Sequence, residues 1–596
     1  MKLLFKTAIL AVLLTSPSLA QEAADAVSPE GATSSGPASW SQAAQEALAL
    51  RDAGQPVEAS SWMVSAANPH AVEAGAAVLA DGGTAADAMI AVQTILGLVE
   101  PQSSGLGGGA FLVWFDAQTG TVTTLDGRET APLNVTPQLF QTSDGEPLKF
   151  FDAVVGGLSV GTPGTPALME EAHRRWGKAN WGSLFDDAKR LARDGFEVSP
   201  RLAGLIERDA ERLGRFPDTA AYFLPGGTPL SVGDTLVNLE YAATLDALAE
   251  NGVRAFYTGP ISAAIVERVQ NAPGNPGYLS QIDLSLYQVK ERPAVCSEYR
   301  DLDVCGMGPP SSGALTVGQI LGLADQFDLS ELGKDDPNSW RIIGDASRLA
   351  FADRGRYMAD SDFVPVPVTG LIDPEYLQQR ALALQTGKAL EEVAPGQPEF
   401  DHALNWADDE AIELPSTSHI SIVDRYGNVL SMTTTIENAF GSRLMVGGFL
   451  LNNELTDFSF RTHRYGVPIA NRIEPGKRPR SSMSPTIVLQ DGNPVLAIGS
   501  PGGSRIIGYV AKSIIAWADW GLNIQEAIEM PHAVNRFGTF DVEAGTEAEN
   551  LVAPLTAMGF EVNARGLNSG LHAIEIGATL RGAADPRREG IALGGD

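Results

Sequence analysis

Cysteine and histidine are scarce in this chain. Its 596 residues include two cysteines and seven histidines. Two cysteines are too few for a disulfide framework or a Cys-rich metal site. None of the histidines stands in an H-E-x-x-H or H-x-H grouping, the spacings typical of metal sites. We therefore expect no metal ion and no other cofactor in this protein.

Basic residues and long apolar runs are also few. The chain has 42 Lys and Arg against 73 Asp and Glu, a formal net charge of −31. Nucleic acids and anionic membranes bind through Lys and Arg that neutralise phosphates. Beyond the N-terminus, no uncharged segment reaches the ~20 apolar residues that a membrane span needs. We therefore expect no nucleic-acid partner and no membrane span.

The first residues have the pattern of a secretory signal peptide. Lys2 and Lys6 make the start positive, residues 8–14 are a short apolar run, and Ser18-Leu19-Ala20 offers small residues for cleavage. A short N-terminal anchor helix is the alternative. We expect residues 1–20 to be a signal peptide and the protein to be soluble and exported, either periplasmic or secreted.

Turn residues and apolar periodicity divide the rest of the chain. Residues 21–61, rich in Ala, Ser, Gly, Pro and Glu, predict a flexible linker with one short helix. Residues 69–79 predict a helix, and Thr84 is suited to cap a second, buried one. Residues 160–290 look mostly helical and carry no chemical signature. Alternation predicts hairpins within residues 110–125, 419–435 and 486–498. The order of elements indicates a layered α+β fold.

Cys296 and Cys305 flank a short stretch, residues 297–301, that has the composition of a hairpin turn. In an exported protein these thiols meet an oxidising environment. The sequence predicts a cross-strand disulfide between them, and two free thiols are the alternative.

Two glycine clusters invite a functional interpretation. Residues 105–109 are not preceded by a strand or followed by Lys, so close backbone packing fits them better than a phosphate loop. The Gly502-Gly503 turn opens a helix and can present two backbone N–H groups to one oxygen, as an oxyanion hole requires.

Hydroxyl residues gather in three segments of the C-terminal part, at residues 416–421, 433–435 and 481–484. On composition alone, a polar loop entering a sheet is the better explanation of the first of them. No G-x-S-x-G elbow is present, and nothing selects a Ser-His-Asp triad.

Together these segments resemble the gamma-glutamyltransferase (glutathione hydrolase) family of N-terminal-nucleophile hydrolases, over nearly all of residues 63–588. The resemblance rests on distinctive strings: Gly105-Leu106-Gly107-Gly108-Gly109, Asp126-Gly127-Arg128-Glu129, Pro309-Pro310-Ser311-Ser312-Gly313, Gly448-Phe449-Leu450-Leu451-Asn452-Asn453, Lys477-Arg478-Pro479-Arg480-Ser481-Ser482-Met483-Ser484-Pro485-Thr486, Gly499-Ser500-Pro501-Gly502-Gly503-Ser504-Arg505 and Ala584-Asp585-Pro586-Arg587-Arg588.

The resemblance implies a four-layer αββα sandwich formed jointly by two subunits of one precursor. Members of the family cut themselves before the Thr that begins a Thr-Thr/Ser-His-x-Ser string, which here is Thr417. Cleavage between Ser416 and Thr417 would give a large subunit ending at residue 416 and a small catalytic subunit of residues 417–596. It would also create the nucleophile and its base together, because the freed α-amino group has an unperturbed pKa of about 8.

The resemblance also assigns roles in catalysis and binding. Thr435 would orient the Thr417 hydroxyl, and the N–H groups of Gly502 and Gly503 would hold the oxyanion. Arg128 would bind the donor's α-carboxylate with hydroxyl groups from Ser481 and Ser482. The carboxylates of Glu454 and Asp457 would accept from the α-ammonium.

The chain departs from the usual pattern in two places. Glu437 stands where many members have Asn, which adds negative charge near the ammonium pocket and bears on the choice of donor. Residues 460–476, the lid region of some members, differ in length and sequence.

The implied activity is cleavage of γ-glutamyl amides such as glutathione, with transfer of the glutamyl group to water, amino acids or peptides. A glutaryl-cephalosporin acylase of the same fold is the alternative. A non-catalytic exported binding protein is a third hypothesis, and the intact Thr417, Thr435 and Gly502-Gly503 set argues against it.

Overall fold

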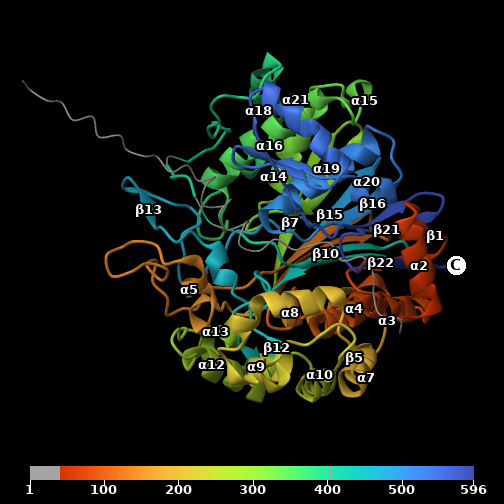
Figure 1. Cartoon of the computed structure of the whole chain (residues 1–596), viewed down its shortest axis with the longest axis vertical. Helices are drawn as coiled ribbons and strands as arrows, with labels where there is room; N and C mark the ends of the chain where they lie inside the picture. Colours follow the sequence, from red (N-terminus) through yellow and green to blue (C-terminus); the bar gives the residue numbers. More distant parts are fainter. Residues whose placement is uncertain (1–39, 403–404, 410, 412) are drawn as a thin grey trace, which may run out of the picture.

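The computed structural model describes residues 40–402, 405–409, 411 and 413–596 (Figure 1). The expected signal peptide, residues 1–20, lies outside the described residues. In the described part of the chain, no helix is both long enough and apolar enough to cross a membrane. The same residues contain no group of three or more His, Cys, Asp or Glu side chains placed to hold a metal ion.

The centre of the molecule is a 13-stranded arrangement that folds into two sheets packed face to face. Strand β7 (Lys290–Tyr299) belongs to both, because its first residues pair with β4 and its later residues pair with β8. In order, the first sheet continues through β8 (Leu302–Met307), β15 (Thr486–Gln490), β16 (Asn493–Gly499), β20 (His572–Ile576), β21 (Leu580–Ala584) and β1 (Val57–Ala59). The second continues through β4 (Thr121–Gly127), β3 (Gly109–Asp116), β10 (Val429–Thr435), β9 (Ser418–Val423), β2 (Trp62–Ala66) and β22 (Ile591–Gly595).

Apolar side chains between the two sheets form an inner core that includes Met63, Val113, Ile487 and Ile574. Helices cover both outer faces (Figure 1). Against the second sheet lie α3 (Pro69–Ala80), α4 (Ala85–Val99) and α6 (Thr165–Trp176). Against the first lie α14 (Gly313–Ala324), α19 (Ile506–Ala518) and α20 (Ile524–Glu529), and α16 (Pro337–Tyr357) packs on α14. The predicted four-layer αββα sandwich is confirmed.

The expected helical region is confirmed as a run of short helices below the second sheet in Figure 1. Within the predicted residues 160–290, α6 is followed by α7 (Asp186–Asp194), α8 (Pro200–Leu213), α9 (Pro217–Phe223), α10 (Leu239–Asn251), α11 (Arg254–Thr258), α12 (Pro260–Gln270) and α13 (Gln281–Leu286). Helix α5 (Phe150–Val154) lies just before this region. The remaining short helices are α15 (Leu329–Leu332), α17 (Val368–Leu371), α18 (Pro374–Ala381) and α21 (Val552–Ala557).

The described part of the chain also forms small sheets that are separate from the sandwich. They pair β5 (Phe196–Glu197) with β6 (Thr235–Leu236), β11 (Met445–Val446) with β12 (Phe449–Leu450), β13 (His463–Arg464) with β14 (Val467–Pro468), and join β17 (Ala533–Asn535), β18 (Thr539–Glu543) and β19 (Glu561–Arg565). The β13–β14 hairpin occupies part of the predicted lid region, and Tyr465 at its tip is exposed.

Helix α4 illustrates how local sequence fixes an element. The Thr84 side chain accepts from the backbone N–H of Asp87, and the Asp87 carboxylate accepts from the N–H of Thr84, a reciprocal capping box. All residues from Ala85 to Val99 are buried. Both the predicted cap and the predicted burial are confirmed.

The flexible linker predicted over residues 21–61 extends too far. Residues 21–39 lie outside the described residues. Gln42–Asp52 forms helix α2, which agrees with the one short helix predicted there, but Val57–Ala59 is the edge strand β1, paired with β21. Helix α2 is held by small buried side chains and by Arg51, which donates to the carbonyl oxygens of Arg588 and Gly590. Contacts made by Ala and Arg leave little apolar periodicity, which is why the segment resembles a linker.

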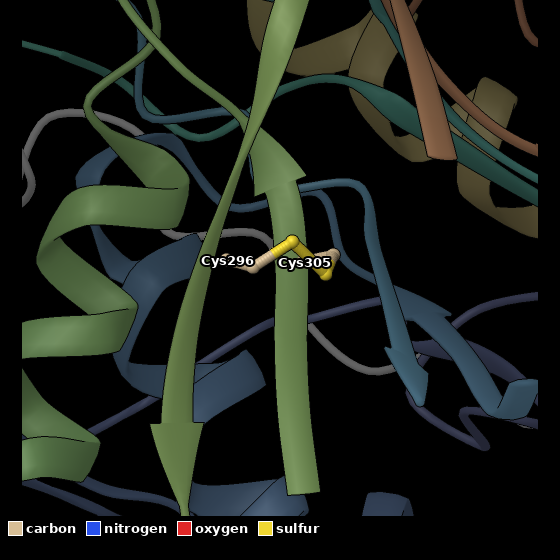
Figure 2. The surroundings of a disulfide bond; sticks show 2 residues. All are labelled: Cys296 and Cys305. Atoms are coloured by element: carbon tan, nitrogen blue, oxygen red, sulfur yellow. A yellow bond between two sulfur atoms is a disulfide. The ribbon is translucent and has the colours of Figure 1, made fainter. Parts of the chain in front are cut away.

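The predicted disulfide between Cys296 and Cys305 is confirmed (Figure 2). The two residues are direct partners across the antiparallel pair β7 and β8, with their Cα atoms 4.0 Å apart. Cys305 is buried in the core between the sheets. The bond therefore ties two adjacent strands near the turn that joins them.

Candidate active site

Thr417 is the last residue before β9, and the strand register decides which side chain it meets. Ser418 pairs with Thr434 on β10, so the next pair along the ladder is Thr417 and Thr435. The Thr417 hydroxyl donates to the Thr435 Oγ1 over 3.1 Å. Thr435 Oγ1 also accepts from the backbone N–H of Glu437 at 2.9 Å. The structure thus brings two predicted catalytic residues into contact.

The backbone at Thr417 is strained. Its φ of 127° lies in the region that favours glycine, where a β-branched residue is a genuine outlier. Two hydrogen bonds hold this conformation: Arg588 Nη1 donates to the Thr417 carbonyl oxygen at 2.9 Å, and Ser416 Oγ donates to the Gln102 carbonyl oxygen at 2.9 Å. The peptide bond predicted to be cut therefore joins a strained residue to a buried, clamped one.

Glycines 105–109 have the packing role that the sequence predicted. A Cβ on Gly108 would lie 1.9 Å from the Thr435 carbonyl oxygen, and one on Gly107 would lie 2.0 Å from that of Leu450. Only glycine lets these backbones approach so closely. The cluster thereby fixes the position of Thr435.

Gly502 and Gly503 lie between β16 and α19 with φ values of 140° and 59°. Gly503 lines the same small cavity as Thr417 and Thr435. The main chain of Leu414 passes directly over Gly503, so a Cβ there would lie 2.8 Å from the Leu414 carbonyl oxygen. The turn thus reaches the site, with the segment before Thr417 lying against it.

Arg128, at the end of β4, is fully buried among acids. Its guanidinium donates to the carboxylate of Glu454, to Asp457 Oδ2 at 2.5 Å, and to the carbonyl oxygens of Pro479 and Arg480. Burial alone lowers the pKa of Arg128, but the neighbouring carboxylates outweigh burial and raise it. The sequence assigned Arg128 and the two acids to opposite ends of a substrate, and the structure pairs them directly.

Negative charge is in excess around this guanidinium. Burial, Asp457 and Glu454 raise the pKa of Glu437 well above its usual range. Burial, with Glu413 and Glu454, likewise raises the pKa of Asp457, against the influence of Arg128. Asp457 Oδ1 is buried and has no hydrogen-bond partner among the described residues. One cation cannot balance these carboxylates, so the arrangement suits an additional positive ligand such as an ammonium group.

Ser481 and Ser482 also line the cavity. Ser481 is held by the segment of residues 309–313, because its carbonyl oxygen accepts from the N–H and the hydroxyl of Ser312. Ser482 donates to the carboxylate of Glu413 and accepts from Arg354 Nη2 at 2.7 Å.

The cavity bounded by all these groups is nearly full. Its free volume is about 20 Å³, room for about one water molecule. Glu413 and Leu414, just before the predicted cleavage site, line it together with Thr417 and Gly503. In the uncut chain, a substrate has no space beside them.

Sequence reasoning missed three residues of this site: Glu413, Arg354 and Arg588. Arg588 belongs to a string that carried the resemblance, but its contact with the Thr417 carbonyl oxygen was not foreseen. Glu413 lies in an acidic stretch with the appearance of a loop, and Arg354 lies on a long helix far from the hydroxyl cluster in sequence. Only three-dimensional contact identifies them.

Comparison with known proteins agrees with this geometry. The family described as Gamma-glutamyltranspeptidase matches residues 71–595. The "Glutathione hydrolase proenzyme" of Bacillus subtilis (strain 168) is 35% identical over 548 residues, covering 89% of this chain and 91% of that protein. The "Acylase ACY 1 proenzyme" of Pseudomonas sp. (strain SE83) is 32% identical over 554 residues, covering 91% of this chain and 95% of that protein. A solved cephalosporin acylase from Bacillus halodurans has a TM-score of 0.80 at 24% identity, covering 91% of this chain and 97% of that one, a likeness of fold.

Proposed function

This chain belongs to the gamma-glutamyltranspeptidase family, and on that premise we propose that it is a self-processing enzyme that cleaves γ-glutamyl amides such as glutathione. The glutamyl group passes to water or to the amino group of an amino acid or peptide. The observation that carries the proposal is the Thr417 hydroxyl, hydrogen-bonded to Thr435 over 3.1 Å on a residue whose own backbone has a strained φ.

The first reaction is cleavage of the chain itself. The Thr417 hydroxyl oxygen attacks the carbonyl carbon of Ser416, the C–N bond breaks, and the nitrogen takes the proton. Water then hydrolyses the resulting ester, which leaves a carboxylate on Ser416 and a free amino group and hydroxyl on Thr417. The strain at Thr417, with its φ of 127°, favours this step because breaking the bond relieves it.

The second reaction is acyl transfer. The new α-amino group takes the proton of the Thr417 hydroxyl as its oxygen attacks the γ-carbonyl carbon of the donor. The N–H groups of Gly502 and Gly503 stabilise the oxyanion, and the loss of one such donor typically costs about 3 kcal/mol. The amine leaves with a proton, and water or an acceptor amine then attacks the glutamyl ester to regenerate Thr417.

Donor recognition uses opposite charges at the two ends of the glutamyl group. Glu454 and Asp457, with Glu437, accept from the α-ammonium. Arg128 attracts the α-carboxylate, and Ser481 and Ser482 donate to it. The unpartnered buried oxygen of Asp457 supports this assignment.

The cleaved chain forms a heterodimer of residues 21–416 and 417–596, and the protein is exported. The charge and apolar pattern of residues 1–20 supports export, and so does the disulfide between Cys296 and Cys305, a bond typical of oxidising compartments. Edman sequencing of the large fragment from the native host tests this: a start near residue 21 is expected, and a start at Met1 contradicts signal removal.

A second candidate is an acylase for glutaryl amides, which the similarity to the Pseudomonas sp. (strain SE83) acylase supports. A glutaryl group has no α-ammonium, so it leaves the excess carboxylates around Arg128 unbalanced. The charge of the site therefore favours the glutamyl donor.

Denaturing electrophoresis, N-terminal sequencing and initial rates test the proposal together. We expect two fragments, the smaller beginning at Thr417, and faster hydrolysis of glutathione than of a glutaryl amide. The Thr417→Ala variant serves as the uncut control. A single band in the wild type contradicts self-processing, and a clear preference for the glutaryl amide favours the acylase.

A further inference from the structure

One buried turn, far from Thr417 in sequence, contacts both groups that the proposed self-cleavage brings together. It consists of residues 100–103, directly after α4, and is closed by the Ser103 N–H, which donates to the Glu100 carbonyl oxygen at 2.9 Å. The side chains of Glu100, Gln102 and Ser103 are buried. We call this segment the 100–103 turn.

The first contact of the turn is with Ser416, the residue that contributes the carbonyl group of the bond to be cut. Ser416 is fully buried, and its Oγ donates to the Gln102 carbonyl oxygen at 2.9 Å. On the other side of the same bond, Arg588 Nη1 donates to the Thr417 carbonyl oxygen at 2.9 Å. Both residues of the bond are therefore anchored, which limits how far the Ser416 carbonyl group can turn.

The second contact is with the segment that follows β10. The Ser103 carbonyl oxygen accepts from the Ile436 N–H at 3.2 Å, and the Gln102 carbonyl oxygen also accepts from the Phe440 N–H at 3.1 Å. Ile436 directly follows Thr435, whose hydroxyl accepts from that of the nucleophile. The same turn therefore sets the positions of the scissile residue and of the Thr435 hydroxyl.

Arg201, in the first turn of α8, holds the 100–103 turn in place. Its Nη1 donates to Glu100 Oε2 at 2.8 Å and to Ser103 Oγ at 3.2 Å. Its backbone N–H donates to Glu589 Oε1 at 3.0 Å. The ion pair with Glu100 is buried on both sides, so loss of the guanidinium leaves a carboxylate that water cannot reach. Arg201 thus acts on the site through the turn.

The two contacts of the turn differ in when they are needed. After the cut, Ser416 is the carboxyl end of the large fragment and takes no part in the proposed acyl transfer. Thr435 stays beside the nucleophile in both reactions. The contact with Ser416 therefore serves the cut alone, whereas the contact with Ile436 serves both reactions.

We propose that the 100–103 turn aligns the scissile bond with the Thr435 hydroxyl, and that Ser416 and Arg201 are positioning residues for self-cleavage. Ser416 acts on the cut only, through its hydrogen bond to the turn. Arg201 acts on the cut and on acyl transfer, because it fixes the turn from which both contacts are made. The inference rests on the proposed self-processing and adds two residues to it.

A pulse of cell-free synthesis, followed by denaturing gels over time, measures the rate of the cut. In Ser416→Ala we expect the cut to slow about tenfold, because one buried hydrogen bond to the turn is lost. Ser416→Thr keeps the donor and should restore most of the rate. Once cut, Ser416→Ala should hydrolyse γ-glutamyl 4-nitroanilide with the kcat and KM of the wild type.

Ser339→Ala is the matched control. Ser339 is a buried serine at the start of α16, and its Oγ donates to the Gly333 carbonyl oxygen at 2.7 Å. This variant should be cut at the wild-type rate. A Ser416→Ala chain that is cut as fast as the wild type, or that has an altered kcat once cut, overturns the role of Ser416 and leaves the proposed function in place. A wild type that stays uncut contradicts the proposed function and the inference with it.

Arg201→Gln tests the turn from the other side. It should slow the cut and lower kcat of the processed enzyme several-fold, with KM little changed, because Thr435 loses its support. The double variant with Glu100→Gln removes the carboxylate that is left unpaired, so the urea midpoint should recover while the rates stay low. Recovery of the rates together with the midpoint would show that Arg201 acts on stability alone and would overturn its positioning role.

Discussion

The Thr435 hydroxyl oxygen accepts two hydrogen bonds, one from the Thr417 hydroxyl and one from the Glu437 N–H. All three groups are buried. Because the Thr417 hydroxyl donates its proton to Thr435, its oxygen keeps its lone pairs for the proposed attack. At the residue scale, we expect the proposed self-cleavage to depend on the Thr435 hydroxyl, which is neither the nucleophile nor the base.

Thr435→Val removes that hydroxyl with little change of shape. The Thr417 hydroxyl and the Glu437 N–H lose their acceptor, which costs about 1–3 kcal/mol for a buried donor. If that cost falls on the reacting geometry, self-cleavage slows about 10- to 100-fold. A time course of the uncut fraction on a denaturing gel measures it. Thr435→Ser should restore cleavage, and equal rates in the Val variant and the wild type would refute the role.

At the element scale, the first turn of α8 is bound by a carboxyl from the other end of the chain. Ser199 Oγ accepts from the Leu202 N–H at 3.2 Å, and Glu589 Oε1 accepts from the Arg201 N–H at 3.0 Å. Burial, followed by Glu100, raises the pKa of Glu589 to about 7. The folded protein therefore keeps a proton there that the unfolded chain releases at lower pH.

Because the pKa of Glu589 is higher in the folded than in the unfolded chain, the free energy of unfolding falls as pH rises from about 4.5 to about 7, by up to about 3 kcal/mol. Glu589→Gln keeps the acceptor oxygen and removes the titration. We expect the variant to be more stable than the wild type at pH 8 and no more stable at pH 4, by urea unfolding at both values. Glu211→Gln, at an exposed position of α8, should leave the stability unchanged at both pH values. An equal shift at both pH values would contradict the assignment.

Helix α2 is joined to the C-terminal part of the chain through Arg51, so a variant at Arg51 measures how much this helix contributes to the stability of the protein. Arg51 Nη1 donates to the carbonyl oxygens of Arg588 and Gly590, and Arg588 in turn donates to the Thr417 carbonyl oxygen. Arg51→Ala leaves two buried carbonyl groups unbonded, so we expect a loss of about 3 kcal/mol in urea unfolding. Arg190→Ala, an exposed i,i+3 pair with Asp187, should lose very little. A loss no larger than that of the control would mean that α2 is dispensable.

At the scale of the whole molecule, blocks of strands from before and after Thr417 are interleaved in the sheet order. In the sheet order, β1, β8, β3 and β2 come from before residue 417, and each pairs with a strand from after it: β21, β15, β10 and β9 respectively, with β2 also pairing with β22. Cutting the chain at Thr417 breaks none of these ladders.

The two fragments should therefore stay together after cleavage. We expect a single peak on size-exclusion chromatography under native conditions, with both fragments in it at every dilution that can be measured. They should separate only when the sandwich itself unfolds, in denaturant. Recovery of a free small fragment under native conditions would contradict an interleaved core.

Local signals predicted those parts of the fold that depend on local sequence. Thr84 is followed at the N3 position by Asp87, and this pattern alone places the start of α4. The hairpin of β9 and β10 was predicted from alternation around a short turn. The disulfide was predicted because its two cysteines flank a second short turn. One short helix was predicted within residues 21–61, but the bounds and packing of α2 were not, because its contacts are made by Ala44, Ala47 and Arg51, which carry no apolar stripe.

By itself the sequence determined the family, and its short strings predicted Thr417, Thr435 and four charged residues of the pocket, because these are properties of side chains and of local order. Those four are Arg128, Glu437, Glu454 and Asp457. The tertiary structure alone decided which charges meet. Arg128 pairs with Glu454 and Asp457, while Glu413 accepts hydrogen bonds from Ser482 and Arg354. The reason is physical: a buried charge takes the partner that packing brings within hydrogen-bond distance, and sequence spacing does not report that distance.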